Sequence, residues 1–235
     1  GDDYEIYARF VFTPEKRGLY LVRALTSRYQ YRTPEMFDRL ADCIAEVTSQ
    51  RNGNYMIFFP SYSFLNEVAD RFMLRYGQTC TVLRQRSGMQ EEEREKFLGR
   101  FDEIYDDQTL LGFCVMGGIF SEGIDLKNDS LIGVMIVGTG IPQVCAEREL
   151  LKKYFDEKGQ NGYDYAYRFP GMNKVQQAAG RVIRTSEDVG IVVLIDDRFL
   201  TPACRRLFPA EWSNAQITDS REVGRLAEKF WNEWL

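Results

Sequence analysis

The chain has 235 residues, of which 44% are hydrophobic and 14% aromatic. This length and composition suit a large α/β domain with a buried core and exclude a disordered chain. The formal net charge of −5 argues weakly against a broadly basic surface for nucleic acid, although a groove that holds one strand requires only local positive charge.

The residue types also exclude several kinds of site. Histidine is absent, which removes Ser-His-Asp triads and the usual catalytic zinc ligands. The five cysteines are widely spaced, so we expect reduced thiols and neither a metal site nor an iron–sulfur cluster in this chain. No run approaches the roughly 18 apolar residues of a membrane span, and no signal-peptide pattern opens the chain. We therefore expect a cytoplasmic protein with no membrane partner.

The first predicted elements lie in residues 1–33, an N-terminal segment that leads into the domain. Within it, residues 6–12 and 19–25 resemble strands. A helix over residues 34–51 is expected next, because Thr33 can cap it and Pro34 suits its first position.

From residue 55 onward, apolar runs alternate with segments of helical periodicity. The runs are almost continuously hydrophobic, which is typical of strands buried on both faces of a parallel sheet; they are residues 55–59, 79–83, 111–115, 131–137 and 190–195. Helices are expected from residue 63, from residue 91 to 105, and over residues 146–155 and 173–184, with a long surface loop at residues 158–170. Residues 218–235 contain an amphipathic helix that should dock back on the domain.

This alternation predicts a fold class. Strand and helix succeed each other along the whole chain, so we expect one α/β domain over residues 1–235, with a doubly wound or RecA-like, three-layer αβα architecture. Its central sheet should be mostly parallel.

The strongest chemical signal is QAAGRVIR, residues 177–184. On a continuous helix Arg181 and Arg184 would share a face, and Gly180 would let that face approach a partner closely. Guanidinium groups offer forked donors that suit phosphate oxygens, so the pattern favours a polyphosphate site. The alternative is a surface helix with ordinary arginines.

Two further motifs follow predicted strands. GGIFSEGIDL, residues 117–126, comes directly after the run at 111–115, and the carboxyl ends of parallel strands are where open α/β sheets bind ligands. FFPSY, residues 58–62, ends another run; Ser61 at a helix start can cap the helix or meet a phosphate. A structural turn and a simple helix cap are the respective alternatives.

Together these three segments resemble motifs VI, V and IV of the XPD/DinG family of superfamily-two DNA helicases. The resemblance covers residues 55–199 and includes the segment TSEDVGIVVLIDDRF, which directly follows QAAGRVIR. It implies the second, C-terminal RecA-like domain of a motor that hydrolyses ATP and moves on single-stranded DNA, in this family five-prime to three-prime.

The resemblance also implies roles for individual residues. Arg181 and Arg184 would be arginine fingers toward ATP, with Gln177 near the γ-phosphate or its attacking water. The other implied contacts fall into two groups, the nucleotide edge and the DNA strand. At the nucleotide edge they are Glu122, Gly123, Asp125 and Gly180; on the DNA strand they are Ser61, Tyr62, Ser121 and Gln85.

A basic and aromatic stretch separates the second and third motifs in the chain. Arg148, Lys152 and Arg168 are interleaved with tyrosines and are candidate contacts to DNA phosphates, since basic groups track the backbone while aromatic rings stack on bases. The alternative is a solvated helix followed by an aromatic loop that packs on its own domain.

Parts of a complete motor are missing from the sequence. It contains no GxxxxGK[ST] phosphate cradle and, without histidine, no DEAH box, and Asp102-Glu103 does not follow a buried strand. Phosphoryl transfer needs a cradle and Mg²⁺ as well as arginine fingers. We therefore expect this chain alone to be inactive, with ATP, Mg²⁺ and any iron–sulfur cluster held by an N-terminal helicase domain of the same protein.

Alternatives stay open at this point. A piece of a longer protein is favoured over one subunit of a split motor. Half of an RNA helicase, a chromatin-type translocase, and a non-catalytic module for nucleic-acid binding or protein docking are the other candidates. Repair, replication-conflict and defence roles are not separated by the sequence.

Overall fold

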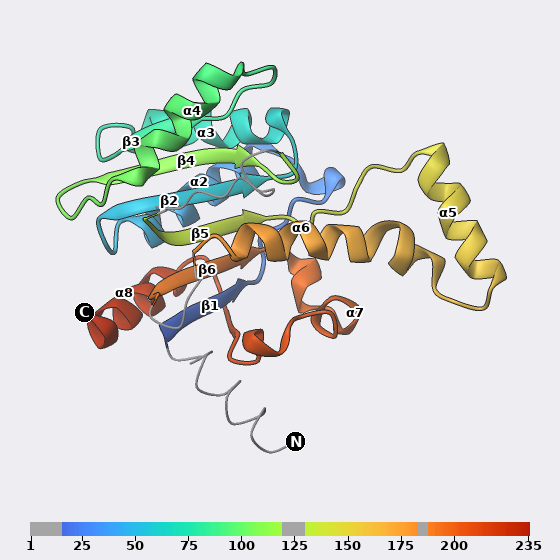
Figure 1. Ribbon diagram of the computed structural model, residues 1–235. Helices are drawn as coiled ribbons and strands as arrows, with labels where there is room; N and C mark the ends of the chain where they lie inside the picture. Colours follow the sequence, from blue (N-terminus) through green and yellow to red (C-terminus); the bar gives the residue numbers. More distant parts are fainter. Residues whose placement is uncertain (1–15, 119–129, 183–187) are drawn as a thin grey trace.

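The computed structural model describes residues 16–118, 130–182 and 188–235. Its strands form one sheet in the order β3-β4-β2-β5-β6-β1-β7, and every pairing is parallel (Figure 1). The strands are β1 (Arg17–Val22), β2 (Gly53–Phe59), β3 (Thr81–Arg84), β4 (Thr109–Val115), β5 (Leu131–Val137), β6 (Gly190–Ile195) and β7 (Gln216–Thr218).

Helices cover both faces of this sheet, which confirms the three-layer αβα architecture. The helices are α2 (Pro34–Thr48), α3 (Tyr62–Tyr76), α4 (Glu91–Gly99), α5 (Ala146–Glu157), α6 (Phe169–Ala179), α7 (Pro202–Arg205) and α8 (Val223–Trp234). Among the described residues, none of these helices combines the length and apolar composition needed to traverse a bilayer.

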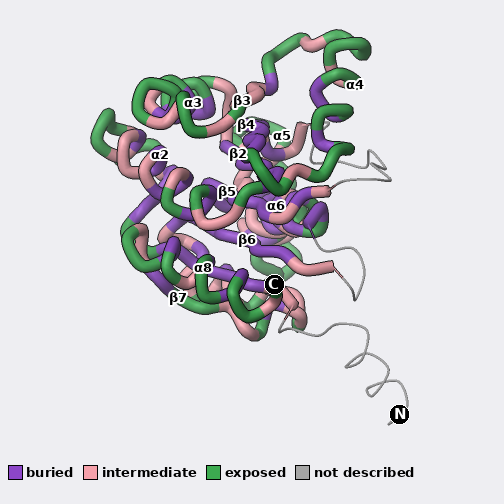
Figure 2. Tube along the Cα trace, turned by 90° about the vertical axis from the view of Figure 1, so that its left-hand side faces the viewer, coloured by how far each residue is buried: buried purple, intermediate pink, exposed green. Residues whose placement is uncertain are grey.

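The side chains of β2 show how one continuous apolar run serves two cores. Tyr55, Ile57 and Phe59 pack in one core with α2, α3 and α8. Met56 and Phe58 pack in the other with α4 and α6. Successive side chains of a strand point to opposite faces, so a strand buried on both sides must be apolar at every position. In Figure 2 the buried strands lie between helices whose outer faces are exposed.

Several expected boundaries are confirmed. The structure places β5 and β6 over the expected residues, and Thr33 caps α2 by accepting a hydrogen bond from the Met36 N–H at 3.2 Å. The C-terminal helix is also present as α8, and its residues Val223, Ala227 and Trp231 are buried in the same core as α2.

The expected loop over residues 158–170 is wrong. The chain is helical from residue 162, passes through a π-helix at Asp164–Arg168 and continues into α6. Pro170 has no N–H to offer the Ala166 carbonyl four residues earlier. That carbonyl instead accepts a hydrogen bond from Arg148 Nη1 at 2.8 Å, and the wider π turn accommodates the proline ring.

Two helix ends also differ from expectation. The helix expected over 173–184 ends at Ala179, with Gly180 as its C-cap, so Arg181 lies beyond the helix; Arg184 is outside the described residues. The helix from residue 91 ends at Gly99 rather than running on to Tyr105, and Ile104 is exposed. In the expected N-terminal strand region, residues 6–12 lie outside the described residues, whereas residues 17–22 form β1.

Candidate functional site at the carboxyl edge of the sheet

The motif at the end of β2 begins α3. Ser61 is the N-cap, and its hydroxyl accepts a hydrogen bond from the Phe64 N–H at 3.2 Å. A capping hydroxyl accepts with its oxygen and keeps its own proton, which it can donate outward. Ser61 and Tyr62 are both half-buried at this edge, so each presents a polar atom beside the end of the strand.

Gln85 ties three elements together at the same edge. It lies one residue past β3 and is only 4% exposed. Its Nε2 donates to the Tyr62 hydroxyl at 3.2 Å, and its Oε1 accepts from the Val115 N–H of β4 at 2.8 Å. Because one amide side chain fixes the ends of β3, β4 and α3 relative to one another, Gln85 holds Tyr62 in place.

The two glycines that follow β4 are crowded by polar side chains. A methyl group at Gly117 would lie 3.3 Å from the Lys174 ammonium nitrogen, and one at Gly118 would lie 3.0 Å from Gln85 Nε2. Gly117 also has a φ of +73°, a conformation that favours glycine. The glycine pair therefore lets Lys174 of α6 and Gln85 approach the backbone closely.

The remainder of that motif lies outside the described residues. Ser121, Glu122, Gly123 and Asp125 belong to this segment, and Arg184 lies in a second one. Their assignments from the resemblance stay predictions.

Helix α6 carries the first three residues of QAAGRVIR, and the described remainder forms the turn after it. Its inner side, with Val175 and Ala178, is buried in the second core, while Gln177 and Gly180 are exposed. Arg181, in the turn after the helix, is 6% exposed. The structure thus brings Gln177 and Gly180 to the surface together but sets Arg181 deeper than a surface helix would.

Helix α5 and the π-helix form an arm, defined here as residues 146–168. Figure 1 shows α5 projecting outward on the side of the domain to which the strand arrows point. None of the residues of α5 is buried. Aromatic contacts hold the arm together: the rings of Phe155 and Tyr165 stack with centroids 4.1 Å apart. The expected aromatic loop is therefore the second helical half of this arm.

The basic candidates of the arm are largely engaged within it. Arg148 donates to the Ala166 carbonyl, and Arg168 pairs closely with Asp164 and lies over the Tyr163 ring with 4.9 Å from guanidinium carbon to centroid. Lys152 is half-buried. These contacts stabilise the arm, and a role of the three residues in DNA binding stays a prediction.

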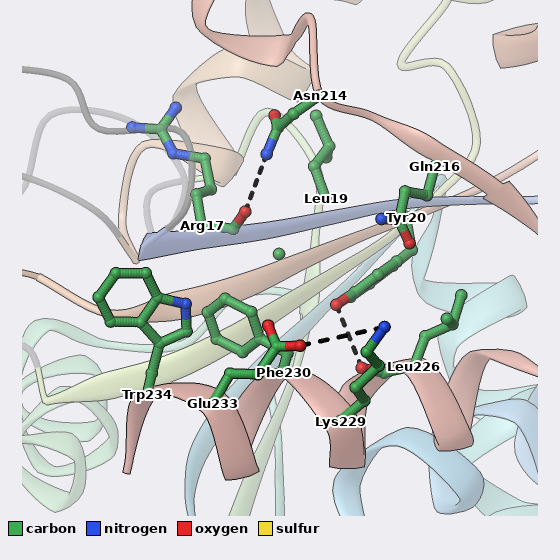
Figure 3. A pocket seen from close by; sticks show the side chains of 11 residues that line it. Arg17, Leu19, Tyr20, Asn214, Gln216, Leu226, Lys229, Phe230, Glu233 and Trp234 are labelled. Carbon is green, nitrogen blue, oxygen red and sulfur yellow. Dashed lines mark hydrogen bonds and ion pairs between the residues drawn. The ribbon is translucent and has the colours of Figure 1, made fainter.

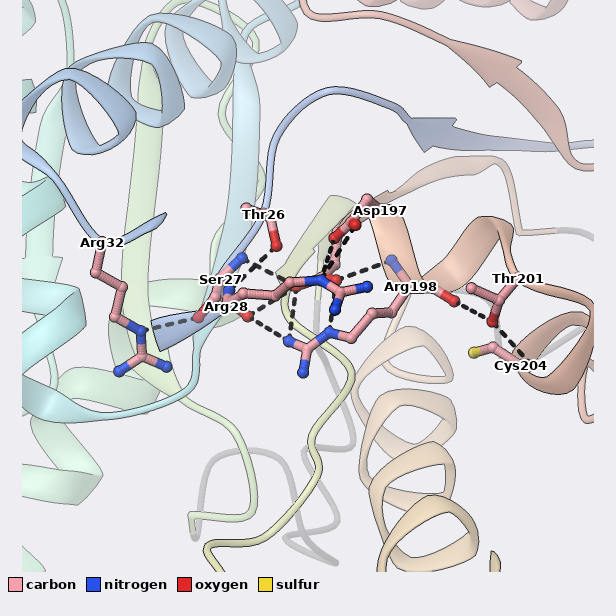
Figure 4. A network of polar contacts seen from close by, with 9 residues as sticks. Thr26, Ser27, Arg28, Arg32, Asp197, Arg198, Thr201 and Cys204 are labelled. Carbon is pink, nitrogen blue, oxygen red and sulfur yellow. Dashed lines mark hydrogen bonds and ion pairs between the residues drawn. The ribbon is translucent and has the colours of Figure 1, made fainter. Parts of the chain in front are cut away.

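A polar network that sequence analysis did not single out joins the ends of β1 and β6 (Figure 4). Asp196 is 1% exposed, and its two carboxylate oxygens accept from the backbone N–H and hydroxyl of Ser27 and from Arg198. Burial alone raises the pKa of Asp196, but the Arg198 guanidinium and these hydrogen bonds outweigh it and leave the pKa below its usual value. Arg28 pairs with the neighbouring Asp197 at 3.1 Å.

One signal could have revealed this network. The residues Asp196, Asp197 and Arg198 follow the buried run of β6 directly, and polar residues at the end of a buried parallel strand lie at the ligand-binding edge of the sheet. Ser27 and Arg28, which follow β1, carry no such signal, because nothing in the sequence shows that β1 pairs with β6.

A separate pocket of 380 Å³ lies between β1 and α8 (Figure 3). Four of its lining residues pair with one another: the Tyr20 hydroxyl donates to the Leu226 carbonyl at 3.3 Å, and Lys229 lies 4.0 Å from Glu233. Burial raises the pKa of Tyr20 to about 12, so its phenol stays neutral. This pocket includes none of the motif residues.

Within the described residues, no cluster of three or more His, Cys, Asp or Glu side chains could hold a metal ion.

Comparison with known proteins identifies the domain. A family model described as "Helicase C-terminal domain" matches residues 44–215, most of the chain. The chain belongs to this family. The match includes the ends of β2, β3, β4 and β6 and the whole of α6, so the carboxyl edge described above is that of a helicase domain.

Individual relatives agree with the expected resemblance to XPD. "ATP-dependent DNA helicase XPD" of Sulfolobus acidocaldarius is 30% identical over 184 residues, which are 74% of this chain and 30% of that protein. "Regulator of telomere elongation helicase 1 homolog" of Drosophila yakuba is 25% identical over 210 residues, 84% of this chain and 21% of that protein. This helicase domain thus spans less than a third of either relative.

Solved structures confirm the fold. The chain named "XPD_Helicase" superposes with a TM-score of 0.70 at 22% identity, over 92% of this chain and 37% of that one. The chain named "XPD_APO" gives 0.69 at 23% identity, over 86% and 40%. At these identities the likeness concerns the RecA-like arrangement of sheet and helices.

Proposed function

We propose that this helicase domain is the C-terminal motor half of an ATP-dependent DNA helicase that translocates on single-stranded DNA. An N-terminal domain of the same protein would hold most of the ATP and its Mg²⁺. The observation that carries the proposal is the meeting, at one edge, of two motif segments and the helix on which the third begins: Tyr62 after β2, Gly117 after β4, and Lys174 on α6.

The DNA side of the proposal rests on the polar groups presented there. The Ser61 hydroxyl can donate to a phosphate oxygen, and the Tyr62 ring can stack on a base while Gln85 holds its hydroxyl. Lys174 adds a positive charge beside the glycine pair. Ser121, which follows the same strand, completes the expected contacts to the backbone.

The nucleotide side rests on α6 and the turn that follows it. Gln177 and Gly180 are exposed on one side of the helix and can approach a second domain, where Gln177 would meet the γ-phosphate or its attacking water. Arg184 and Arg181 would stabilise charge on the phosphates, and the low exposure of Arg181 strengthens such an interaction because little water screens it. Glu122, Gly123 and Asp125 would link the nucleotide edge to the DNA contacts.

Bound ATP would supply the free energy for closing and reopening the gap between the two halves. The residues of this domain would contribute charge stabilisation and positioning, and the proposed N-terminal half would supply the phosphate cradle and the metal site that phosphoryl transfer also needs. Alternate closure and release would move the DNA strand along the carboxyl edge, with the expected five-prime to three-prime polarity.

The test uses the full-length protein and measures ATP hydrolysis with and without single-stranded DNA. Arg184→Ala should reduce the maximal turnover by roughly a thousandfold, the scale of arginine-finger losses. Arg71→Ala is the matched control: Arg71 lies on α3 and pairs with Asp38 and Glu67, and its loss should leave turnover unchanged.

Near-normal turnover of the Arg184 variant would disprove the finger assignment. Unwinding of duplexes with a five-prime or a three-prime tail tests the polarity, and matched RNA duplexes test the RNA-helicase alternative. A wild-type protein that hydrolyses ATP at the same rate with and without DNA, and unwinds neither duplex, would favour a docking module instead.

A further inference from the structure

A concave site lies at the same edge of the sheet, apart from Ser61, Tyr62 and Gln85. It is a pocket of 220 Å³, which we call the arginine pocket, between the ends of β1, β5 and β6 and the start of α6. This volume is many times the ~10–15 Å³ that one water molecule requires. The lining includes three guanidinium groups from three separate segments, namely those of Arg28, Arg168 and Arg198.

The pocket has an excess of positive charge. Two groups of polar contacts surround it and together contain five arginines and three aspartates. In one group Arg198 pairs with Asp196, Arg28 pairs with Asp197, and Arg32 donates to the Ser27 carbonyl; in the other, Arg168 and Arg206 pair with Asp164. The surplus of two guanidinium groups favours an anion. Arg28 pairs with Asp197 through Nε, and no hydrogen bond to a described residue engages its two terminal nitrogens.

A buried hydroxyl without a partner points in the same direction. Thr139 follows β5, lines the pocket and is 5% exposed, and its Oγ1 makes no hydrogen bond to any described residue. A buried hydroxyl of this kind destabilises a fold unless something satisfies it. Its position is fixed, because methyl groups at Gly138 and Gly140 would lie 2.8 Å from Ser27 Oγ and 2.7 Å from the Gly171 carbonyl oxygen.

We propose that the arginine pocket binds a phosphodiester group of the nucleic-acid strand, with Thr139 donating its hydroxyl proton to a phosphate oxygen beside the guanidinium groups of Arg28, Arg168 and Arg198. Guanidinium forks from three directions suit the several oxygens of a phosphate better than the two of a carboxylate. This inference rests on the proposed function, since it places a second anchor on the strand held at Ser61 and Tyr62.

The geometry of the sheet supports one strand reaching both places. The end of β2 and the end of β1 are separated by three strand spacings in the order β2-β5-β6-β1. Neighbouring strands lie about 4.8 Å apart, so the two places are on the order of 14 Å apart along the edge. A single strand of a few nucleotides can span this distance.

The test measures binding of a fluorescein-labelled oligothymidylate of about twenty nucleotides to this chain by fluorescence anisotropy. Thr139→Val removes the hydroxyl and keeps the shape of the side chain; it should weaken binding about fivefold without lowering the melting temperature. Arg28→Gln should weaken binding about tenfold and reduce the slope of log affinity against log salt by about one. Arg75→Gln is the control, because it also removes one paired guanidinium, from the far end of α3.

Each outcome separates the inference from the proposed function. Wild-type binding that neither Thr139→Val nor Arg28→Gln weakens, or a loss as large in Arg75→Gln, overturns the inference and leaves the function intact. A second outcome would also overturn the inference. If inorganic phosphate or ATP raises the melting temperature of the wild type but not of Thr139→Val, and both proteins bind the oligonucleotide equally well, the pocket binds a free anion. A wild-type chain that binds no oligonucleotide overturns the DNA-binding part of the proposed function itself.

Discussion

Replacing Asp196 with asparagine tests the network that joins β1 to β6. The side chain keeps its shape, but one acceptor oxygen becomes a donor. All five hydrogen bonds at Asp196 are accepted: two by Oδ1, from the backbone N–H and Nε of Arg198, and three by Oδ2, from the N–H and hydroxyl of Ser27 and from Arg198 Nη2. Whichever oxygen is replaced, at least two of these hydrogen bonds are lost and two donors face each other.

The magnitude follows from those losses. Each hydrogen bond contributes about 1 kcal/mol between neutral groups and about 1.5–3 kcal/mol when one group is charged. Water can partly satisfy Arg198, whose side chain is 28% exposed, so we take the lower part of the range. The free energy of unfolding should fall by about 3 kcal/mol, and the melting temperature by roughly 6–12 °C for a domain of this size.

The assay is urea unfolding of the wild type and Asp196→Asn at neutral and acid pH. The native pKa of Asp196 is lowered, so its stabilisation is fully present above the unfolded pKa of about 3.9 and is lost as pH falls through the native pKa. The difference between the two proteins should therefore be constant from pH 7 to pH 5 and shrink below about pH 4. Asp70→Asn, at an ion pair whose carboxylate is 70% exposed, is the control. A loss below about 1 kcal/mol at pH 7 would refute the argument.

Two other predictions concern packing. Iodoacetamide should modify the exposed Cys145 in the native protein but react with Cys43 only on unfolding, because burial raises the pKa of the Cys43 thiol to about 12. Mass spectrometry of labelled peptides checks this, and labelling of Cys43 before unfolding would contradict the packing of α2. Gly140→Ala should lower the free energy of unfolding by about 1 kcal/mol more than Gly159→Ala. Both glycines have a positive φ, but only the new methyl group at position 140 would collide with backbone atoms, those of Gly171. Equal losses in urea titrations would refute this.

The sheet could be predicted from the sequence because its strands satisfy one simple physical condition. A strand such as β5 or β6 that is buried on both faces must be apolar throughout, and those strands begin and end where their apolar runs do. The edge strand β7 escaped prediction, since it has only three residues and Ile217 is half exposed. So short an edge strand has neither the length nor the continuous hydrophobicity of the central strands.

The path from β5 to β6 was harder to predict because it depends on tertiary contacts. Proline and glycine in residues 158–170 indicated a loop, but the helix continues because Arg148 satisfies the carbonyl that Pro170 leaves without a donor. Arg148 is 18 residues from that carbonyl in the sequence, so no local pattern contains the information. The same contact explains why α6 begins earlier than its apolar periodicity suggests.

Similar reasoning applies to the candidate site. The sequence could indicate Ser61, Tyr62 and Gln85, because each lies within three residues of the end of an apolar run and the ends of parallel strands meet at one edge. The hydrogen bonds among Gln85, Tyr62 and Val115 confirm that the ends of β3 and β4 and the start of α3 meet. Thr139 and Arg28 could not be identified, since a threonine after a strand has no chemical signature until its hydroxyl is found buried without a partner.

The positive charges of the arm and of the arginine pocket differ in what they can still bind. Arg148 is committed to a backbone carbonyl inside the arm, so it has less capacity to neutralise a phosphate. Arg168, at the base of the arm, pairs with Asp164 and also lines the pocket. The arm therefore has a second consequence: by fixing the π-helix, it holds Arg168 opposite Arg28 and Arg198, where the three guanidinium groups and Thr139 converge. A surface that looks merely basic along the sequence is thus divided by its internal hydrogen bonds into a structural arm and a pocket able to bind an anion.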